Sequence, residues 1–175
     1  MKIRGNKVFG LLIALFSTIA FAIFILFYKV FATKPPDPQI KYGEFPFRLE
    51  YEINGEIIVI EDTVICEYDG IGWNEGVGKH RKWKQYLADN GGDDLLLLII
   101  DDTKKIYASV GGAKYYMGDE EAHIVRNSLT PNPYIVEVDG NITRYRSISE
   151  EDLFEKYAIR FTNWEYSTPI VNSFN

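Results

Sequence analysis

Cysteine is almost absent from this 175-residue chain, which has one cysteine, two histidines and two methionines. The single cysteine, Cys66, excludes an internal disulfide. It alternates with Val64 and Tyr68 in a strand-like stretch, a pattern that predicts a buried thiol behaving as a small hydrophobic residue. His80 and His123 have no cysteine or second histidine at ligand spacing beside them. The sequence therefore predicts no metal site.

Positive charge is scarce beyond the first 34 residues. Five of the 19 basic residues lie at or before Lys34 and all 25 acidic residues lie after it, so residues 35–175 carry 14 basic and 25 acidic side chains and a net charge of −11. Nucleic-acid binding requires cations that neutralise phosphates, and an anionic membrane surface repels an acidic domain. We therefore predict no nucleic-acid partner.

Motifs for nucleotides, calcium and catalysis are missing. The glycine-rich segment Asp69–Gly78 is expected to be a loop, and with Lys79 it resembles the end of a phosphate-binding loop. The spacing G-x-x-x-x-G-K-[ST] fails at Trp73 and at His80. The oxygen-rich segment Asp89–Asp94 lacks the residue order of a calcium loop. We predict no nucleotide, no cofactor and no catalytic residue.

One long apolar run, Val8–Tyr28, contains no charged residue and has basic residues on both sides. A helix rises about 1.5 Å per residue, so roughly 20 apolar residues cover the ~30 Å hydrocarbon core of a bilayer. Ser17 and Thr18 can bond to carbonyls one turn earlier and are tolerated there. The run predicts a transmembrane helix over residues 8–31, which follows a basic tail, residues 1–7.

A cleaved secretory signal is the alternative interpretation of this run. Val30-Phe31-Ala32 has the small-x-small spacing of a cleavage site, and the segment before the run is basic. However, the apolar region of a signal usually has about 7–15 residues, which is shorter than this run. Tyr28 and Lys29 also place a bulky ring and a charge close to that site. The length favours a helix that is retained as a membrane anchor.

The orientation of the anchor follows from the basic residues Lys2, Arg4 and Lys7, which favour a cytoplasmic N-terminus. The remainder is then extracytoplasmic, on the cell membrane of a bacterium that does not use disulfides outside the cell; a cytoplasmic domain is the alternative. Three prolines between Thr33 and Gln39 predict a stiff, extended linker over residues 32–42, which lifts the domain off the bilayer.

Residues 43–175 have the alternation of apolar and polar residues that is typical of strands. Phe45–Ile53 alternates in this way, and Asn54-Gly55 supplies two residues that tolerate positive φ in a tight turn. The return strand is expected from Glu56 to about Tyr68. These segments predict a β-hairpin.

Further elements follow the same reasoning. Ser149 is expected to cap a short helix, Glu150–Tyr157, and another short helix is expected to begin near Asp119. The remaining expected strands are Leu95–Ile100 (buried on both faces), Ile106–Val110, a hairpin of Tyr134–Val138 and Ile142–Ile148 across Asp139-Gly140, and Ile159–Ser167. The predicted fold is mainly β with an α+β margin: about eight short strands in an antiparallel, sandwich-like domain with one or two short helices.

The candidate binding residues are Trp73, His80, Arg81 and Trp83. Trp73 lies in the glycine-rich segment, and the other three belong to the basic cluster Lys79–Lys84, which is expected to be a strand. Aromatic and basic residues are over-represented at recognition sites, so the cluster could bind an anionic cell-wall polymer or an envelope protein. The alternative is a solvated strand face with Trp83 pointing inward.

Three short motifs carry a resemblance to a known group of proteins. They are Arg81-Lys82-Trp83, Tyr115-Tyr116-Met117-Gly118-Asp119, and Trp164 with the later Pro169-Ile170-Val171-Asn172. On these motifs the chain resembles a group of small, uncharacterised, membrane-anchored proteins of Gram-positive bacteria, over most of residues 43–175. The resemblance implies an exported domain and implies no activity, substrate or catalytic residue.

The predicted function is therefore a membrane-anchored domain that acts by binding. One alternative is an accessory subunit of a membrane or cell-envelope complex. The other is a cell-envelope hydrolase that uses two carboxylates, which must lie roughly 5–9.5 Å apart in a cleft. Acidic pairs such as Asp93-Asp94 and Asp101-Asp102 are expected at turns, where solvation already explains them.

Overall fold

The computed structural model describes residues 4–32, 34–76, 78–89, 91–119 and 130–175. The chain divides into two compact units, which we call the helical unit (Met1–Asp37 and Gly70–Lys82) and the sheet unit (Pro38–Asp69 and Trp83–Asn175). The described residues form three helices and eight strands, and the strands make two four-stranded antiparallel sheets.

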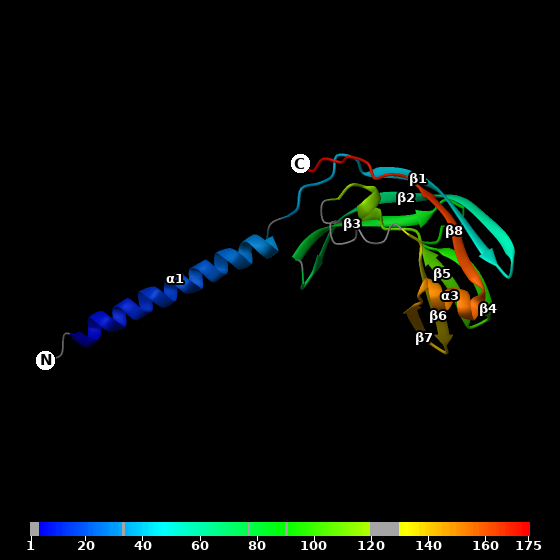
Figure 1. Cartoon of the computed structure of the whole chain (residues 1–175). Coiled ribbons are helices and arrows are strands. Elements are labelled where there is room, and N and C mark those ends of the chain that lie inside the picture. The colour runs from blue at the N-terminus through cyan, green and yellow to red at the C-terminus, as the bar shows by residue number, and fades with distance from the viewer. Residues whose placement is uncertain (1–3, 33, 77, 90, 120–129) are drawn as a thin grey trace. The chain divides into compact units, whose positions relative to one another are not determined.

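The helical unit contains the longest helix, α1 (Arg4–Ala32), which is blue in Figure 1. Its window Leu12–Lys29 has a mean hydropathy of 2.2, and none of this window is buried. Of the described helices it is the one long and apolar enough to cross a membrane, and a signal sequence has the same properties. The Thr18 hydroxyl donates to the Leu15 carbonyl over 2.8 Å, as expected in an apolar helix. The predicted apolar helix is confirmed, with a start at Arg4 instead of residue 8.

The first sheet has the strand order β3-β2-β1-β8. Its strands are β1 (Tyr42–Ile53), β2 (Glu56–Asn74), β3 (Gly78–Leu87) and β8 (Ile159–Tyr166). The turn between β1 and β2 is formed by Asn54 and Gly55 with φ of 52° and 86°, so the predicted hairpin is confirmed. Alternate residues of β1 from Phe45 to Tyr51 are buried, as the sequence pattern requires.

The second sheet has the strand order β4-β5-β6-β7. Its strands are β4 (Leu95–Asp101), β5 (Lys104–Ser109), β6 (Asn132–Asp139) and β7 (Ile142–Ser147). The second predicted hairpin is confirmed, with its turn one residue later than expected. Asp139 still pairs with Ile142, so Gly140 and Asn141 form the turn, and Gly140 supplies a positive φ of 59°.

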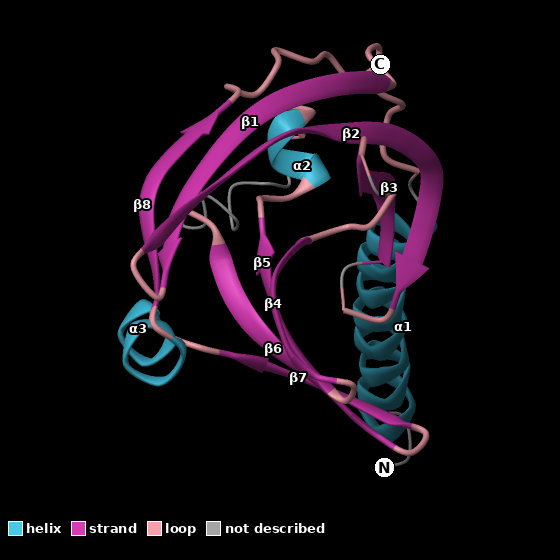
Figure 2. Cartoon of the chain, turned by 90° about the vertical axis from the view of Figure 1, so that its right-hand side faces the viewer, coloured by secondary structure: helices cyan, strands magenta, loops and turns pink. Residues whose placement is uncertain are grey.

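Two short helices, α2 (Ala113–Tyr116) and α3 (Glu150–Tyr157), complete the sheet unit. Figure 2 shows α2 beneath β1, where the rings of Tyr116 and Phe45 stack with centroids 4.8 Å apart. The Ser149 hydroxyl accepts the Asp152 N–H over 3.1 Å, which confirms the predicted cap of α3. The sequence did not predict α2, and the helix expected after Asp119 falls on residues 120–129, outside the described residues.

One apolar core joins both sheets and both short helices of the sheet unit. The Tyr51 hydroxyl crosses it and donates to the Leu97 carbonyl over 3.2 Å. Cys66 is completely buried in this core, as predicted, and burial raises the pKa of its thiol to about 12. A thiol with so high a pKa is inert at neutral pH.

Two expectations about individual segments are wrong. Leu95–Ile100 is not buried on both faces: Leu95 and Leu97 enter the core, while Ile99 is 56% exposed. The expected loop Asp69–Gly78 is mostly strand, since β2 continues to Asn74. The mainly β, antiparallel fold class is confirmed.

Candidate functional site

Three of the four predicted binding residues belong to the helical unit. Trp73, near the end of β2, has 57% of its surface exposed. Arg81 is only 6% exposed, and its Nη1 donates to the carbonyl of Pro36 over 3.4 Å. His80 points to the opposite face of β3, because side chains alternate along a strand. Trp73 is therefore available to a partner, whereas Arg81 bonds to the linker.

The fourth predicted residue, Trp83, lies on β3 in the sheet unit. Its Nε1 donates to Oδ2 of Asp119 over 2.9 Å, and its ring meets Tyr68 edge-on with centroids 5.4 Å apart. Asp119 is 2% exposed. The cluster Lys79–Lys84 thus lies on a strand, as expected, and Trp83 packs against the core, as the alternative interpretation required.

A shallow hollow of about 540 Å³ lies beside Trp83. Lys84, Gln85, Tyr86 and Asp93 line its walls. The side chains around it are already used in contacts: Gln85 donates to the carbonyl of Gly111 over 3.0 Å, and the Tyr86 hydroxyl donates to Glu67 over 2.9 Å. These bonds hold the walls of the hollow, and they leave few polar groups directed towards a ligand.

A larger cleft of about 600 Å³ lies on the outer side of the first sheet, in the sheet unit. We call it the Arg48 cleft. Strands β1, β2 and β8 and the turn after β3 form its walls. Among the described residues that line it, Arg48 carries a positive charge, and four residues carry negative charge: Glu61, Asp62, Asp89 and Glu165.

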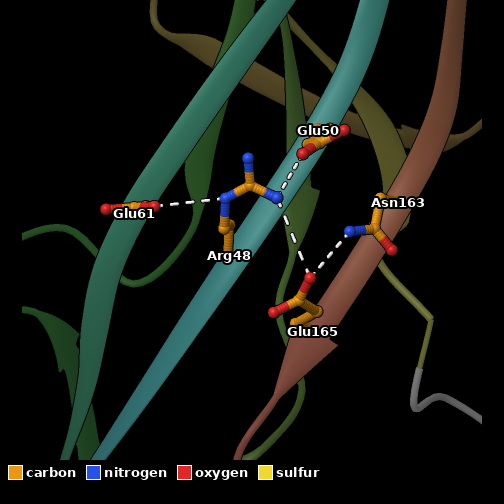
Figure 3. A network of polar contacts seen from close by, with 5 residues as sticks. All are labelled: Arg48, Glu50, Glu61, Asn163 and Glu165. Atoms are coloured by element: carbon orange, nitrogen blue, oxygen red, sulfur yellow. Dashed lines mark hydrogen bonds and ion pairs between the residues drawn. The ribbon is translucent and has the colours of Figure 1, made fainter.

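The guanidinium of Arg48 joins three strands across this cleft, as Figure 3 shows. Its Nε lies 3.1 Å from Oε1 of Glu61 on β2, and its Nη1 lies 3.8 Å from Oε1 of Glu165 on β8. Nη1 also pairs with Glu50 on β1. Strand register explains this meeting, because Arg48 is directly opposite both Glu61 and Glu165 in the sheet.

The charge state of Arg48 is set by these neighbours. Desolvation lowers the pKa of Arg48. The hydrogen bond and charge of Glu50, together with the carboxylates of Glu165 and Glu61, act in the opposite direction and outweigh desolvation. The pKa of Arg48 is therefore raised above its ordinary value. Arg48 is therefore a permanent cation. Since one cation faces three carboxylates, this part of the cleft has an excess of negative charge.

Two further groups shape the cleft. Asp62 accepts the N–H of Thr63 over 2.6 Å and the N–H of Asp89 over 3.2 Å, so it fixes the turn after β3 against β2. Tyr166 stacks on Trp164 with ring centroids 5.8 Å apart and remains partly exposed at the rim. An aromatic face beside carboxylates is a surface that attracts cationic groups.

The cleft offers a ligand several carboxylates and one guanidinium. Within the part of the chain that the structure describes, no group of three or more histidine, cysteine, aspartate and glutamate side chains is arranged to hold a metal ion. The sequence pattern marked Arg48 only as an outward residue of β1. Its partners Glu61 and Glu165 could not be recognised, because the pairing of β1 with β8 joins segments more than 100 residues apart.

Comparison of the chain with known protein families, with curated proteins and with solved structures gave no match.

Proposed function

We propose that this protein is a single-pass membrane protein whose β-rich domain acts by binding. The observation that carries the membrane part is α1: its window Leu12–Lys29 is strongly apolar and wholly unburied, so lipid is the solvent that would cover it. The basic residues at the N-terminus favour the orientation in which the domain lies outside the cytoplasm.

Membrane fractionation tests this anchor. The full-length chain should sediment with membranes, resist extraction by alkaline carbonate and need detergent for release. Protease added to intact spheroplasts should degrade the sheet unit. A soluble product that begins after Ala32 would instead establish a cleaved signal, and full protection from protease would establish a cytoplasmic domain.

We propose the Arg48 cleft as the binding site of the domain. Its volume, its open shape and its carboxylates support a ligand that carries positive charge, such as a lysine-rich segment of an envelope protein. Glu61 and Glu165 are both mainly exposed, so their carboxylates can reach such a ligand. The partly exposed ring of Tyr166 adds a face for the cation.

Binding of a short lysine-rich peptide to the detergent-solubilised chain tests this site. Glu61→Gln with Glu165→Gln should weaken binding about tenfold or more, since pairs of close charges contribute on the order of 1–2 kcal/mol. The matched control is Glu151→Gln with Glu155→Gln on α3, which also removes two exposed charges but lies outside the cleft. Equal weakening of binding by the control would show that the net charge of the domain, and not the Arg48 cleft, causes the effect.

The predicted role of Trp73 and the basic cluster remains a separate hypothesis. Polyphosphate is a suitable probe, because it imitates an anionic cell-wall polymer. Binding of polyphosphate that is lost in Trp73→Ala and kept in Glu61→Gln would move the site from the Arg48 cleft to the predicted residues.

Hydrolysis by two carboxylates is a second candidate function, because Glu61 and Glu165 line one cleft. A carboxyl that serves as a general acid is usually sheltered from water, whereas the side chains of Glu61 and Glu165 are both mainly exposed. Arg48 bonds to both, so binding is the better supported function. Hydrolysis of cell-wall polysaccharide by the wild type, abolished in Glu61→Gln, would reverse this order.

The accessory-subunit alternative predicts stable co-purification with a membrane complex.

A further inference from the structure

The segment that follows β8 turns back along the linker that leads from α1. Within the sheet unit, the N–H of Gln39 donates to the carbonyl of Ser173 over 2.8 Å. Pro38 and Phe174 form an isolated antiparallel bridge beside this bond. The last residues of the linker are therefore held by residues more than 130 positions later in the chain.

Asn172 is the centre of this contact. Its Oδ1 accepts the N–H of Ile40 over 3.0 Å, and its Nδ2 donates to the carbonyl of Ile40 over 2.9 Å. The same Nδ2 also donates to the carbonyl of Met117 over 3.1 Å. Both hydrogens of the amide are thus used, and its oxygen also has a partner. An aspartate in this position would have no hydrogen to donate to either carbonyl.

The other side of the contact is fixed to the core. The N–H of Ile170 donates to the carbonyl of Tyr116 over 2.9 Å. Tyr116 itself is almost completely buried, and its hydroxyl donates to the carbonyl of Val110 over 2.6 Å. The segment after β8 therefore connects the linker to a buried part of the sheet unit.

We infer that residues 170–174 form a clasp on the linker, with Asn172 as its central residue. The clasp fixes residues 38–40 to the sheet unit. The tether, by which we mean the free part of the linker, then consists of residues 33–37 between α1 and the clasp. Opening the clasp would add residues 38–40 to the tether, which is about 10 Å of extended chain. The holding of the linker by Asn172 is independent of the proposed membrane anchor and of the Arg48 cleft. Its use in setting a distance from the bilayer rests on the anchor.

Hydrogen exchange of the full-length chain in detergent, followed by mass spectrometry, tests the clasp. The amides of Gln39 and Ile40 both donate into it, so a peptide that covers residues 38–42 reports its opening. Asn172→Ala should accelerate exchange in this peptide about tenfold or more, because the hydrogen bonds that Asn172 makes to Ile40 and Met117 are lost. Asn172→Asp should do the same. The matched control is Asn163→Ala, which removes an amide bonded to Glu165 on β8.

Each outcome decides the inference. Faster exchange confined to residues 38–42 and to the segment after β8 supports the clasp. Unchanged exchange at residues 38–42 in Asn172→Ala overturns it. Faster exchange in all strands also overturns it, because Asn172 would then stabilise the whole domain instead of holding the linker. Failure of the membrane fractionation leaves this result untouched and removes only the tether interpretation.

Discussion

Replacement of Gly118 by alanine should be one of the most damaging small substitutions in the sheet unit. Gly118 has a φ of 62°, and a Cβ built on it would lie 2.3 Å from the carbonyl oxygen of Ile170. Backbone atoms cannot rotate away as a side chain can, so the segment after β8 must move. Its bond from the Ile170 N–H to the Tyr116 carbonyl would then be broken.

The loss of stability in Gly118→Ala has two causes, the positive φ and the displaced segment after β8. Alanine in the left-handed region costs about 1 kcal/mol more than glycine. The displaced segment loses the bond at Ile170 and the bond from Asn172 to Met117, at about 1 kcal/mol each. We therefore expect the free energy of unfolding to fall by about 3 kcal/mol, a large share of the roughly 5–15 kcal/mol of a typical domain.

Gly140→Ala is the matched control for this substitution. Gly140 has nearly the same φ, 59°, but a Cβ there would meet no atom within 4 Å. Gly140→Ala should therefore lower the free energy of unfolding by only about 1 kcal/mol. Urea unfolding of both variants, followed by the fluorescence of the partly buried tryptophans Trp83 and Trp164, measures the difference. Equal losses in the two variants would refute the argument from the Ile170 carbonyl.

Three further predictions concern stability. Ala158 caps α3 with a φ of 53°, so Ala158→Gly should raise the free energy of unfolding by about 1 kcal/mol in urea titrations. Trp83→Phe keeps an aromatic ring but removes the donor to buried Asp119. It should therefore lower the free energy of unfolding by about 1–3 kcal/mol, and a loss below about 0.5 kcal/mol would contradict that role. The hydrogen bond and charge of Lys104 lower the pKa of Glu137 below its ordinary value of 4.5. The ion pair therefore stabilises the fold above pH 4.5, and this contribution is lost as the pH falls through the lowered pKa. Lys104→Met should reduce the free energy of unfolding at pH 7 and leave it unchanged at about pH 2.

The elements that the sequence predicted well are those governed by local rules. The alternation from Phe45 to Ile53 and the pair Asn54-Gly55 depend on side-chain period and positive φ, which neighbouring residues decide. The cap at Ser149 is local in the same way. The helix α1 follows from composition alone.

The elements that were missed depend on contacts distant in sequence. Gly72 allows β2 to continue, because β3 lies so close that a Cβ on Gly72 would come within 2.8 Å of the side chains of His80 and Lys82. The exposure of Ile99 depends on which face of its sheet is covered by the core, and no local pattern reveals this. The Arg48 cleft required the register of β1 with both β2 and β8.

The motifs that carried the resemblance have a structural explanation in this fold. In the helical unit, Arg81 donates to the linker carbonyl of Pro36. In the sheet unit, Asn172 bonds to Ile40 and to Met117. Two of the three motifs thus contribute residues that hold the linker, and Met117 of the third motif accepts a hydrogen bond from Asn172.

None of these motifs contains Arg48, Glu61 or Glu165, the residues of the proposed binding cleft. Proteins that share the motifs would therefore share the way in which the domain is fastened to its tether, and they would be unrestricted in what they bind. A relative with the Asn172 contact but an uncharged residue in place of Arg48 should show the same slow exchange at residues 38–42. It should also bind the lysine-rich peptide at least as tightly as this chain does, because the cleft would keep its carboxylates and lose the positive charge of Arg48 that opposes a cationic ligand.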